Sequence, residues 1–420
     1  MRLSLLRARV PMSIRTHLSR GVRTRWIVVS SLLLTTIAMA QGPLPNAVPP
    51  PPPPPGRVVM QLGEGVVFTS PDTGNSLQLR LRGQMQAAAL RPIAGGETAI
   101  GAQVRRLRVL ARGQHFDGRL ETYVQLGLAQ SDLEARPVPL RDAMVTWRAH
   151  RYLEVRFGQQ KMPYGRQRRT SSGNLQLVDR SATVAEFNLD RDVGLMLGSA
   201  DLFGLDGRVG YAVGVFGGAG RNRAETAPGV LWLARVSLEP LGRFDEQVEA
   251  DLKRRSTPRF AIAASGGVND RTDRLRSTHG EFTPAGTLRY RHYGVDFHAK
   301  WRGLSLQSEW MRRDGTVAAA PTDPAVPAPT PRSGWGAYGQ LGYVLPLRTS
   351  LPAVELVSRF GVVRAARDAP TALRDEREAG GGVNLYLRGH DLKVQLDAFH
   401  LRTASAPDSV RVRLQVQIWL

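Results

Sequence analysis

The most chemically suggestive side chains in this sequence are arginines that alternate with apolar residues. Leu77, Leu79 and Leu81 share one parity, and a similar alternation recurs in the segment 103–114. Successive side chains of an extended chain point to opposite faces. The opposite parity therefore places five guanidinium groups on one surface: Arg80, Arg82, Arg106, Arg108 and Arg112. Because a guanidinium offers a planar fork of donors to phosphate and carboxylate oxygens, this surface predicts anion binding.

Enzymatic sites are not indicated. The eight histidines are scattered and lack the His-x-x-x-His or His-Glu-x-x-His spacing of zinc enzymes. The absence of cysteine excludes disulfides and thiolate metal ligands. The glycines at 217–220 precede polar loop residues and not a helix, so they do not indicate a phosphate-binding loop. We therefore expect no catalytic residue, no metal site and no cofactor.

The first forty residues predict an export signal. Seven arginines and no acidic residue precede residue 41, and a short apolar run ends in Ala38-Met39-Ala40. This layout is typical of a secretory signal peptide cleaved after Ala40, with Met12 as an alternative start. Of the 57 basic residues, 50 then remain against 36 acidic ones, so the exported chain keeps a net charge of +14.

Two short segments precede the main domain. Residues 41–57 are a Pro-rich spacer whose unbroken run from Pro49 to Pro55 favours an extended conformation. Residues 58–75 form a short N-terminal periplasmic segment with one expected strand at 66–69 and a turn at 71–74. The main domain covers residues 76–420.

The main domain has the pattern of a transmembrane antiparallel β-barrel. Apolar and polar residues alternate in segments of roughly ten, and the polar face is dense in Arg and Gln, as an aqueous lumen requires. Long and short connections also alternate, which is typical of extracellular loops and periplasmic turns. The charged link 240–256 is the exception, since a short turn is expected there. We predict sixteen strands, near 76–88, 103–114, 119–129, 139–148, 152–159, 190–199, 205–216, 228–239, 257–267, 286–301, 304–313, 334–346, 352–365, 376–388, 391–402 and 409–420.

Two details of the strands lead to further expectations. Trp147, Tyr152, Trp301 and Trp419 stand beside periplasmic ends, which predicts an aromatic girdle at the membrane interface. In 286–301 the apolar residues change phase, and a β-bulge near Tyr293 would restore it.

The barrel assigns the arginines to the lumen. An arginine that faces lipid near the midplane costs about 2 to 4 kcal/mol. In the lumen the same side chains create a positive wall, and a narrow channel focuses that field on passing anions. Arg105 has the opposite parity to Arg106, so we expect it to point outward and rank it below its neighbour.

Several of these pieces resemble the phosphate-selective porin O and P family of outer-membrane channels. The resemblance covers roughly residues 76–420 and is clearest in the stretch 157–165, Phe-Gly-Gln-Gln-Lys-Met-Pro-Tyr-Gly. Other pieces with the family's order and spacing are Leu79-Arg80-Leu81-Arg82-Gly83, Arg105-Arg106-Leu107-Arg108, Leu140-Arg141-Asp142-Ala143, Thr170-Ser171-Ser172 and Asp179-Arg180-Ser181. It implies a trimeric barrel of the Gram-negative outer membrane that conducts small anions such as phosphate.

The resemblance also implies that the long loop 160–189 folds inward and narrows the pore. The candidate constriction residues are Lys161, Arg166, Arg168, Arg169 and Arg180. They could instead be solvated or pair with Glu186 and Asp190, just as lumenal arginines could pair with Asp142, Glu154 and Asp397. The family's phosphate-specific members rely on lysine here, but Lys161 is the only lysine of this loop, so strict phosphate selectivity does not carry over.

Two other classes of protein remain open. A general or structural barrel without anion preference would share the strand pattern. A basic secreted protein that binds nucleic acid would suit the pI of about 11.2, but it gives no reason for the alternation of loop lengths. We therefore expect outer-membrane lipid and small anions as partners, and no nucleic acid.

Overall fold

The structure is a computed structural model that describes residues 56–133, 138–223, 229–283, 285–347 and 352–420. The expected signal peptide and nearly all of the spacer lie outside the described residues. The elements are β1 (Arg57–Gln61), β2 (Gly65–Thr69), β3 (Ser76–Pro92), β4 (Ala99–His115), β5 (Leu120–Gly127), η1 (Gln130–Asp132), β6 (Leu140–His150), β7 (Leu153–Lys161), α1 (Arg166–Arg169), α2 (Ala182–Phe187), β8 (Arg191–Ser199), η2 (Leu202–Gly204), β9 (Val209–Phe216), β10 (Leu231–Leu238), β11 (Arg259–Thr272), β12 (Thr287–Trp301), β13 (Leu304–Ala319), β14 (Gly334–Val344), β15 (Ala353–Ala365), β16 (Glu376–Arg388), β17 (Leu392–Thr403) and β18 (Ala406–Trp419).

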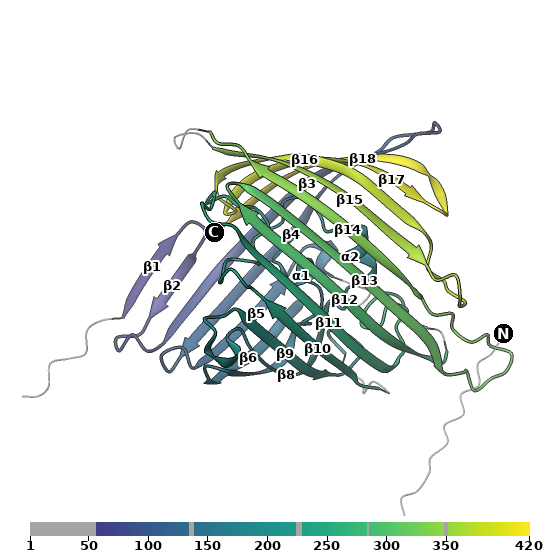
Figure 1. Cartoon of the computed structure of the whole chain (residues 1–420), viewed down its shortest axis with the longest axis horizontal. Helices are drawn as coiled ribbons and strands as arrows, with labels where there is room; N and C mark the ends of the chain where they lie inside the picture. The colour runs from purple at the N-terminus through teal and green to yellow at the C-terminus, as the bar shows by residue number, and fades with distance from the viewer. Residues whose placement is uncertain (1–55, 134–137, 224–228, 284, 348–351) are drawn as a thin grey trace, which may run out of the picture. The chain divides into compact units, whose positions relative to one another are not determined.

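Strands β3 to β18 form a closed antiparallel barrel of 16 strands. Each strand pairs with the next along the chain, and β18 closes the ring against β3, where Trp419 lies opposite Arg82. Figure 1 shows the strands tilted across the barrel wall. Closure gives the backbone groups of these strands partners within the sheet, which a hydrocarbon environment requires. The expected all-β barrel, with each of its strands, is confirmed.

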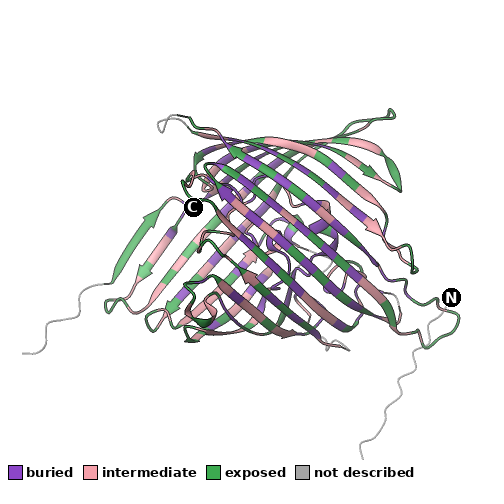
Figure 2. Ribbon diagram, viewed as in Figure 1, coloured by how far each residue is buried: buried purple, intermediate pink, exposed green. Residues whose placement is uncertain are grey.

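The two faces of the barrel wall differ in character. Figure 2 shows buried and exposed residues alternating along the strands. Outward-facing Leu195 is 44% exposed and Leu396 is 48% exposed, and similar apolar residues recur on the other strands. Such an extensive apolar outer surface is suited to lipid. Within the described residues, no helix has the length and apolar composition needed to cross a bilayer.

A small hairpin lies outside the closed ring. Strand β2 pairs with the first residues of β3, Ser76 to Leu79, and β1 pairs with β2. The sequence predicted a strand only at β2. All five residues of β1, Arg-Val-Val-Met-Gln, are exposed, and they show no alternation of apolar and polar residues. The period-2 signal that located the other strands is therefore missing in β1.

The β-bulge expected near Tyr293 is wrong. Strand β12 pairs continuously with β11 from Tyr290 to Lys300. Leu288 and Tyr290 instead face inward and are fully buried, whereas Val295 faces outward and is 44% exposed. The apolar residues change faces because connecting segments fold into the barrel and cover this part of the inner wall.

Candidate functional site

The connection between β7 and β8, residues 162–190, lies inside the barrel and carries α1 and α2. The side chains of Val184 and Phe187 in α2 are fully buried. They belong to an apolar cluster that joins this inward loop to the inner wall, with the members Met162, Tyr164, Val184, Phe187, Leu189, Phe216, Leu231, Leu233, Met311, Tyr338, Val363 and Leu373. The inward fold expected for 160–189 is confirmed.

The tip of the inward loop binds the opposite wall through polar groups. Arg82 in β3 donates to the hydroxyl groups of Ser171 and Ser172, each at 2.9 Å. Gly173 lies so close to this wall that a Cβ there would be 2.9 Å from Nε1 of Trp419. The loop therefore spans the lumen between an apolar contact and a polar one.

A β-bulge in β4 brings two neighbouring arginines to the same carboxylate. Gln84 lies opposite Arg106 and Met85 lies opposite Val104, so Arg105 is the extra residue. Arg105 approaches Asp179 of the inward loop at 3.3 Å, and Arg106 does so at 2.8 Å. The expectation that Arg105 points outward is wrong, because a bulge interrupts the strict alternation of side chains.

All five arginines expected on the lumenal face lie there, in different environments. Arg108 forms an ion pair with Asp132 at 2.6 Å. Arg112 is 3.8 Å from Glu121, and half of its side chain is exposed. Arg82 and Arg106 bind the inward loop as described above. Arg80 stacks on the ring of Trp419, 4.1 Å from its centroid.

The position of Trp419 corrects another expectation. Trp147 and Trp301 face outward, with exposures of 54% and 45%, as interface residues should. Trp419 is only 5% exposed and points into the lumen, beneath Gly173 and beside Arg80 and Arg82. The assignment of Trp419 to the girdle is wrong. A position near the end of a strand places a side chain at the level of the membrane interface, but the alternation along the strand decides whether it faces lipid or the lumen.

The candidate constriction residues have different partners. Lys161 is the last residue of β7, and its Nζ donates to the carbonyl group of Arg169 at 2.8 Å. Arg180 donates to the carbonyl groups of Gln167 and Thr170, at 2.8 and 2.7 Å. Arg166 is buried and binds Gln307 and the carbonyl group of Glu246. Arg168 pairs with Asp190. Arg169 lies 3.7 Å from the carboxylate of Glu246.

The link between β10 and β11, residues 239–258, also enters the barrel. Glu249 accepts a hydrogen bond from Gln167 at 3.2 Å and another from the backbone N–H of Gln176 at 2.9 Å. Asn174 donates to the carbonyl group of Gln247 at 3.3 Å. The link between β10 and β11, which the sequence showed to be unusually long for a periplasmic turn, thus enters from the expected periplasmic end of the barrel and contacts the inward loop. Its contacts had no sequence signal beyond that length and charge.

A cavity of about 610 Å³ remains beside these two segments, against strands β4 to β10. Its lining includes Arg108, Arg112, Lys161 and Arg169, together with several carboxylates such as Glu121. Four of the ten expected residues therefore line this open part of the lumen. Among the described residues, no group of three His, Asp or Glu side chains is arranged to hold a metal ion.

Two carboxylates of the inward loop are held ionised by arginines. Burial opposes ionisation of Asp179, but Arg106, Arg105 and Arg413 hold its pKa below the usual value for aspartate. Burial likewise opposes ionisation of Glu186, yet its guanidinium partners, Arg313 foremost, lower its pKa to about 2. Arg180 is a cation in the same surroundings, and burial together with the positive charges of Arg168 and Arg106 lowers its pKa. The loop therefore lies in a strongly positive field.

Solved outer-membrane proteins share this fold. The anion-selective porin of Comamonas acidovorans is 10% identical, with 82% of this chain and 100% of that chain covered at a TM-score of 0.52. The outer-membrane channel DcaP of Acinetobacter baumannii is 11% identical, with 84% and 99% covered at 0.52. OmpT of Vibrio cholerae is 10% identical, with 83% and 98% covered at 0.51. At these identities the similarity shows the fold alone. No curated protein sequence matches this chain significantly.

A sequence model of one family covers the barrel. The model for phosphate-selective porin O and P matches residues 77–418. The match runs from the second residue of β3 to the last residue but one of β18, so it includes the inward loop and all ten candidate arginine and lysine residues. The chain therefore belongs to the phosphate-selective porin O and P family and forms a transport channel of the Gram-negative outer membrane.

Proposed function

We propose that this porin lets small anions such as phosphate diffuse through an arginine-lined channel that the inward loop narrows. The wall residues of the proposal are Arg80, Arg82, Arg106, Arg108 and Arg112, and the loop cations are Lys161, Arg166, Arg168, Arg169 and Arg180. Family membership supports the outer-membrane channel. The preference for anions is supported by the charge balance around the loop.

The observation that carries the proposal is a set of cations held by uncharged oxygens. Arg82 binds two serine hydroxyl groups, and Lys161 and Arg180 bind backbone carbonyl groups. None of the three forms an ion pair with a residue that the structure describes. Hydroxyl and carbonyl oxygens satisfy the donors without cancelling the charge. The positive potential therefore remains available to passing anions.

Other lumenal arginines are neutralised, which makes a general porin the alternative. Arg413 pairs with Asp397 at 2.8 Å, and Arg191 pairs with Asp142 at 2.9 Å. Such pairs polarise a pore without selecting the sign of the ion. The unneutralised cations therefore decide between the two functions.

Reversal potentials in planar bilayers under a potassium chloride gradient test the proposal. The wild type should prefer anions, and the double variant Lys161→Gln/Arg180→Gln should lose most of that preference. The selectivity of the wild type should also weaken as salt rises, because the Debye length is about 8 Å at physiological ionic strength. Arg312→Gln is the matched control, since its side chain faces outward and is 44% exposed. Equal permeability of both ions through the wild type would establish the general porin instead.

The proposal also covers assembly and export. Family membership supports a homotrimer, which chemical cross-linking in native outer membranes would detect as a threefold increase in mass. Cleavage after Ala40 would appear in the N-terminal sequence of the mature protein.

A further inference from the structure

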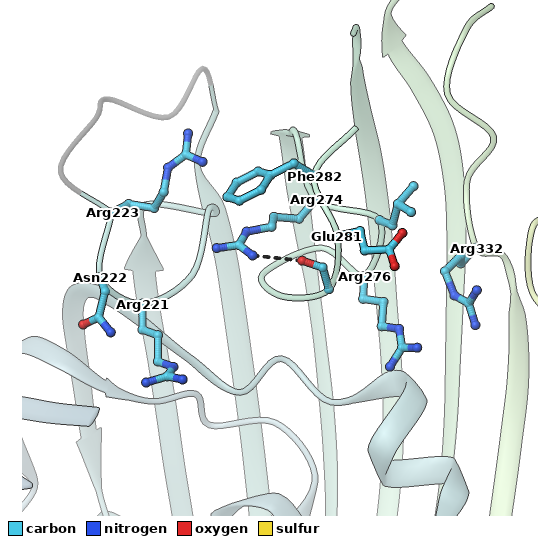
Figure 3. A pocket seen from close by; sticks show the side chains of 10 residues that line it. Arg221, Asn222, Arg223, Arg274, Arg276, Glu281, Phe282 and Arg332 are labelled. Carbon is cyan, nitrogen blue, oxygen red and sulfur yellow. Dashed lines mark hydrogen bonds between the residues drawn. The ribbon is translucent and has the colours of Figure 1, made fainter. Parts of the chain in front are cut away.

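The expected extracellular connections hold arginines through partners within the protein. Figure 3 shows several of these arginines around a cavity between the connections β9–β10, β11–β12 and β13–β14. Arg223 pairs with Asp273 at 3.0 Å. Arg332 binds Glu186 and the carbonyl group of Ala372. Arginines on this inner side of the barrel therefore join the connecting segments to one another.

The outer face of β12 carries arginines in different surroundings. Arg289 and Arg291 are exposed, and in the described part of the chain neither side chain has an ion pair or a hydrogen bond. From the expected extracellular end, the outward-facing residues of β12 are Arg289, Arg291, Tyr293, Val295, Phe297, Ala299 and Trp301. The order is thus two cations, an aromatic ring, three apolar side chains and a second aromatic ring.

This order matches the profile of a membrane. Trp301 follows Tyr293 by eight positions, which is roughly 27 Å along the strand and about 20 Å in height at a tilt near 40°. The apolar band of an outer-membrane barrel is about 25 Å tall and has aromatic residues at both borders. Tyr293 and Trp301 therefore mark the two interfaces. Arg289 and Arg291 lie beyond the outer interface, at the level of the lipid headgroups.

The neighbouring strands continue this arrangement. Arg312 of β13 lies opposite Tyr293, and Trp335 of β14 lies opposite Arg312. Both face outward, since 44% of the Arg312 side chain and 38% of Trp335 are exposed. Asp314 accepts a hydrogen bond from Nε of Arg312 at 2.9 Å, and the two terminal nitrogens of Arg312 have no partner among the described residues. Three guanidinium groups thus lie beside an aromatic interface, and one of them pairs with a carboxylate.

A second place on the outer wall has like charges directly opposite each other. Arg377 of β16 is paired across the strands with Arg402 of β17, and both side chains are exposed. Like charges in such positions repel each other. Asp408 is 3.9 Å from Arg402, whereas Arg377 has no ionic partner within the ranges that the structure describes. An anion between the two arginines would remove this repulsion.

We infer that the outer wall binds lipids whose headgroups carry two or more phosphate groups, in the leaflet that faces the outside of the cell. The phosphate groups pair with Arg289, Arg291 and Arg312 at one place and with Arg377 and Arg402 at the other, because the guanidinium fork matches phosphate oxygens. The acyl chains cover the apolar residues beneath and hold the headgroup at the level of the arginines. The occupant is therefore a lipid and not a free anion, and the surface is separate from the lumen.

Native mass spectrometry of the full protein in a zwitterionic detergent tests the inference. The probes are diphosphoryl and monophosphoryl lipid A of the same acylation, which differ by one phosphate group. The wild type should bind the diphosphoryl form preferentially. The triple variant Arg289→Gln/Arg291→Gln/Arg377→Gln should bind this form at least about fivefold more weakly, because each arginine at a membrane surface contributes about that factor. Millimolar inorganic phosphate at constant ionic strength should not displace the lipid.

The charge-matched control is Arg119→Gln/Arg151→Gln/Arg302→Gln. These three arginines are exposed in the expected periplasmic turns, and the variant should bind the lipids as the wild type does. Heat-modifiable migration on gels verifies folding, and Arg377→Gln alone decides the matter if the triple variant does not fold. Equal binding of the two lipids by the wild type, wild-type binding by the outer-wall variant, an equal loss in the control, or displacement by phosphate overturns the inference. Because no current is measured, the result does not depend on whether the pore prefers anions.

Discussion

The inward loop contacts two walls of the barrel in different ways. On the wall formed by β9 to β15, Phe187 and Val184 pack into an apolar cluster that excludes water. On the wall formed by β3, β4 and β18, Arg82 and Arg106 bind hydroxyl and carboxylate groups of the loop. We call the first the anchoring wall and the second the polar wall. The anchoring wall combines apolar packing with the ion pairs of Glu186, whereas the polar wall holds the loop through polar groups alone.

The largest effect is expected at the anchoring wall. Phe187→Ala removes a fully buried ring that packs so closely that a Cβ at Gly336 would lie 2.9 Å from it. Deletions of this kind cost about 3 to 5 kcal/mol. We expect the loop to detach, which should raise single-channel conductance and expose the loop to protease. Phe157→Ala is the control, because Phe157 faces outward and is 61% exposed. Wild-type conductance in a folded Phe187→Ala protein would show that the apolar contact does not hold the loop.

A second effect is pH dependent and also belongs to the anchoring wall. The pKa of Glu186 is lowered from 4.5 to about 2 in the folded protein, so its ion pairs stabilise α2 fully above pH 4.5. This contribution, about 3 kcal/mol by linkage, is lost as the pH falls towards 2. The protection factors of the α2 amides, which are corrected for the intrinsic pH dependence of exchange, should therefore fall in this acid range in the wild type. Glu186→Gln should show weak protection at neutral pH and no such acid transition. An identical pH profile for both proteins contradicts the assignment.

The smallest effect is expected at the polar wall. Gly173→Ala places a methyl group 2.9 Å from Nε1 of Trp419 and 3.0 Å from Arg82. Overpacking costs about 1 to 3 kcal/mol, and the tip should move away from the wall without detaching. We expect a modest loss of anion preference in reversal potentials, with protease resistance unchanged. Gly339→Ala is the control, since its Cβ would meet nothing within 4 Å. A detached loop in Gly173→Ala would mean that the polar wall also anchors it.

The barrel could be predicted from the sequence, because alternation and loop length are local properties repeated in every strand. Parity also placed Arg82, Arg106 and Arg108 correctly on the inner face. The alternation rule failed at Arg105, because a β-bulge turns this side chain towards Asp179 of the inward loop. The pairing of Glu186 with Arg313 joins residues 127 positions apart. Nothing in either segment alone indicates it, and the same holds for the entry of link 239–258 into the barrel.

The contacts of the loop tip also set the order of folding. Gln417 in β18 donates to the carbonyl group of Gly173 across 244 residues, and Arg82 reaches Ser172 across 90. Contacts between such distant residues form late, because closing a long loop of chain costs entropy before any contact repays it. Residue Gln417 belongs to the strand that closes the ring. The channel thus acquires its narrow section only at the final step of assembly, and a barrel still open at the seam between β3 and β18 would lack a formed constriction.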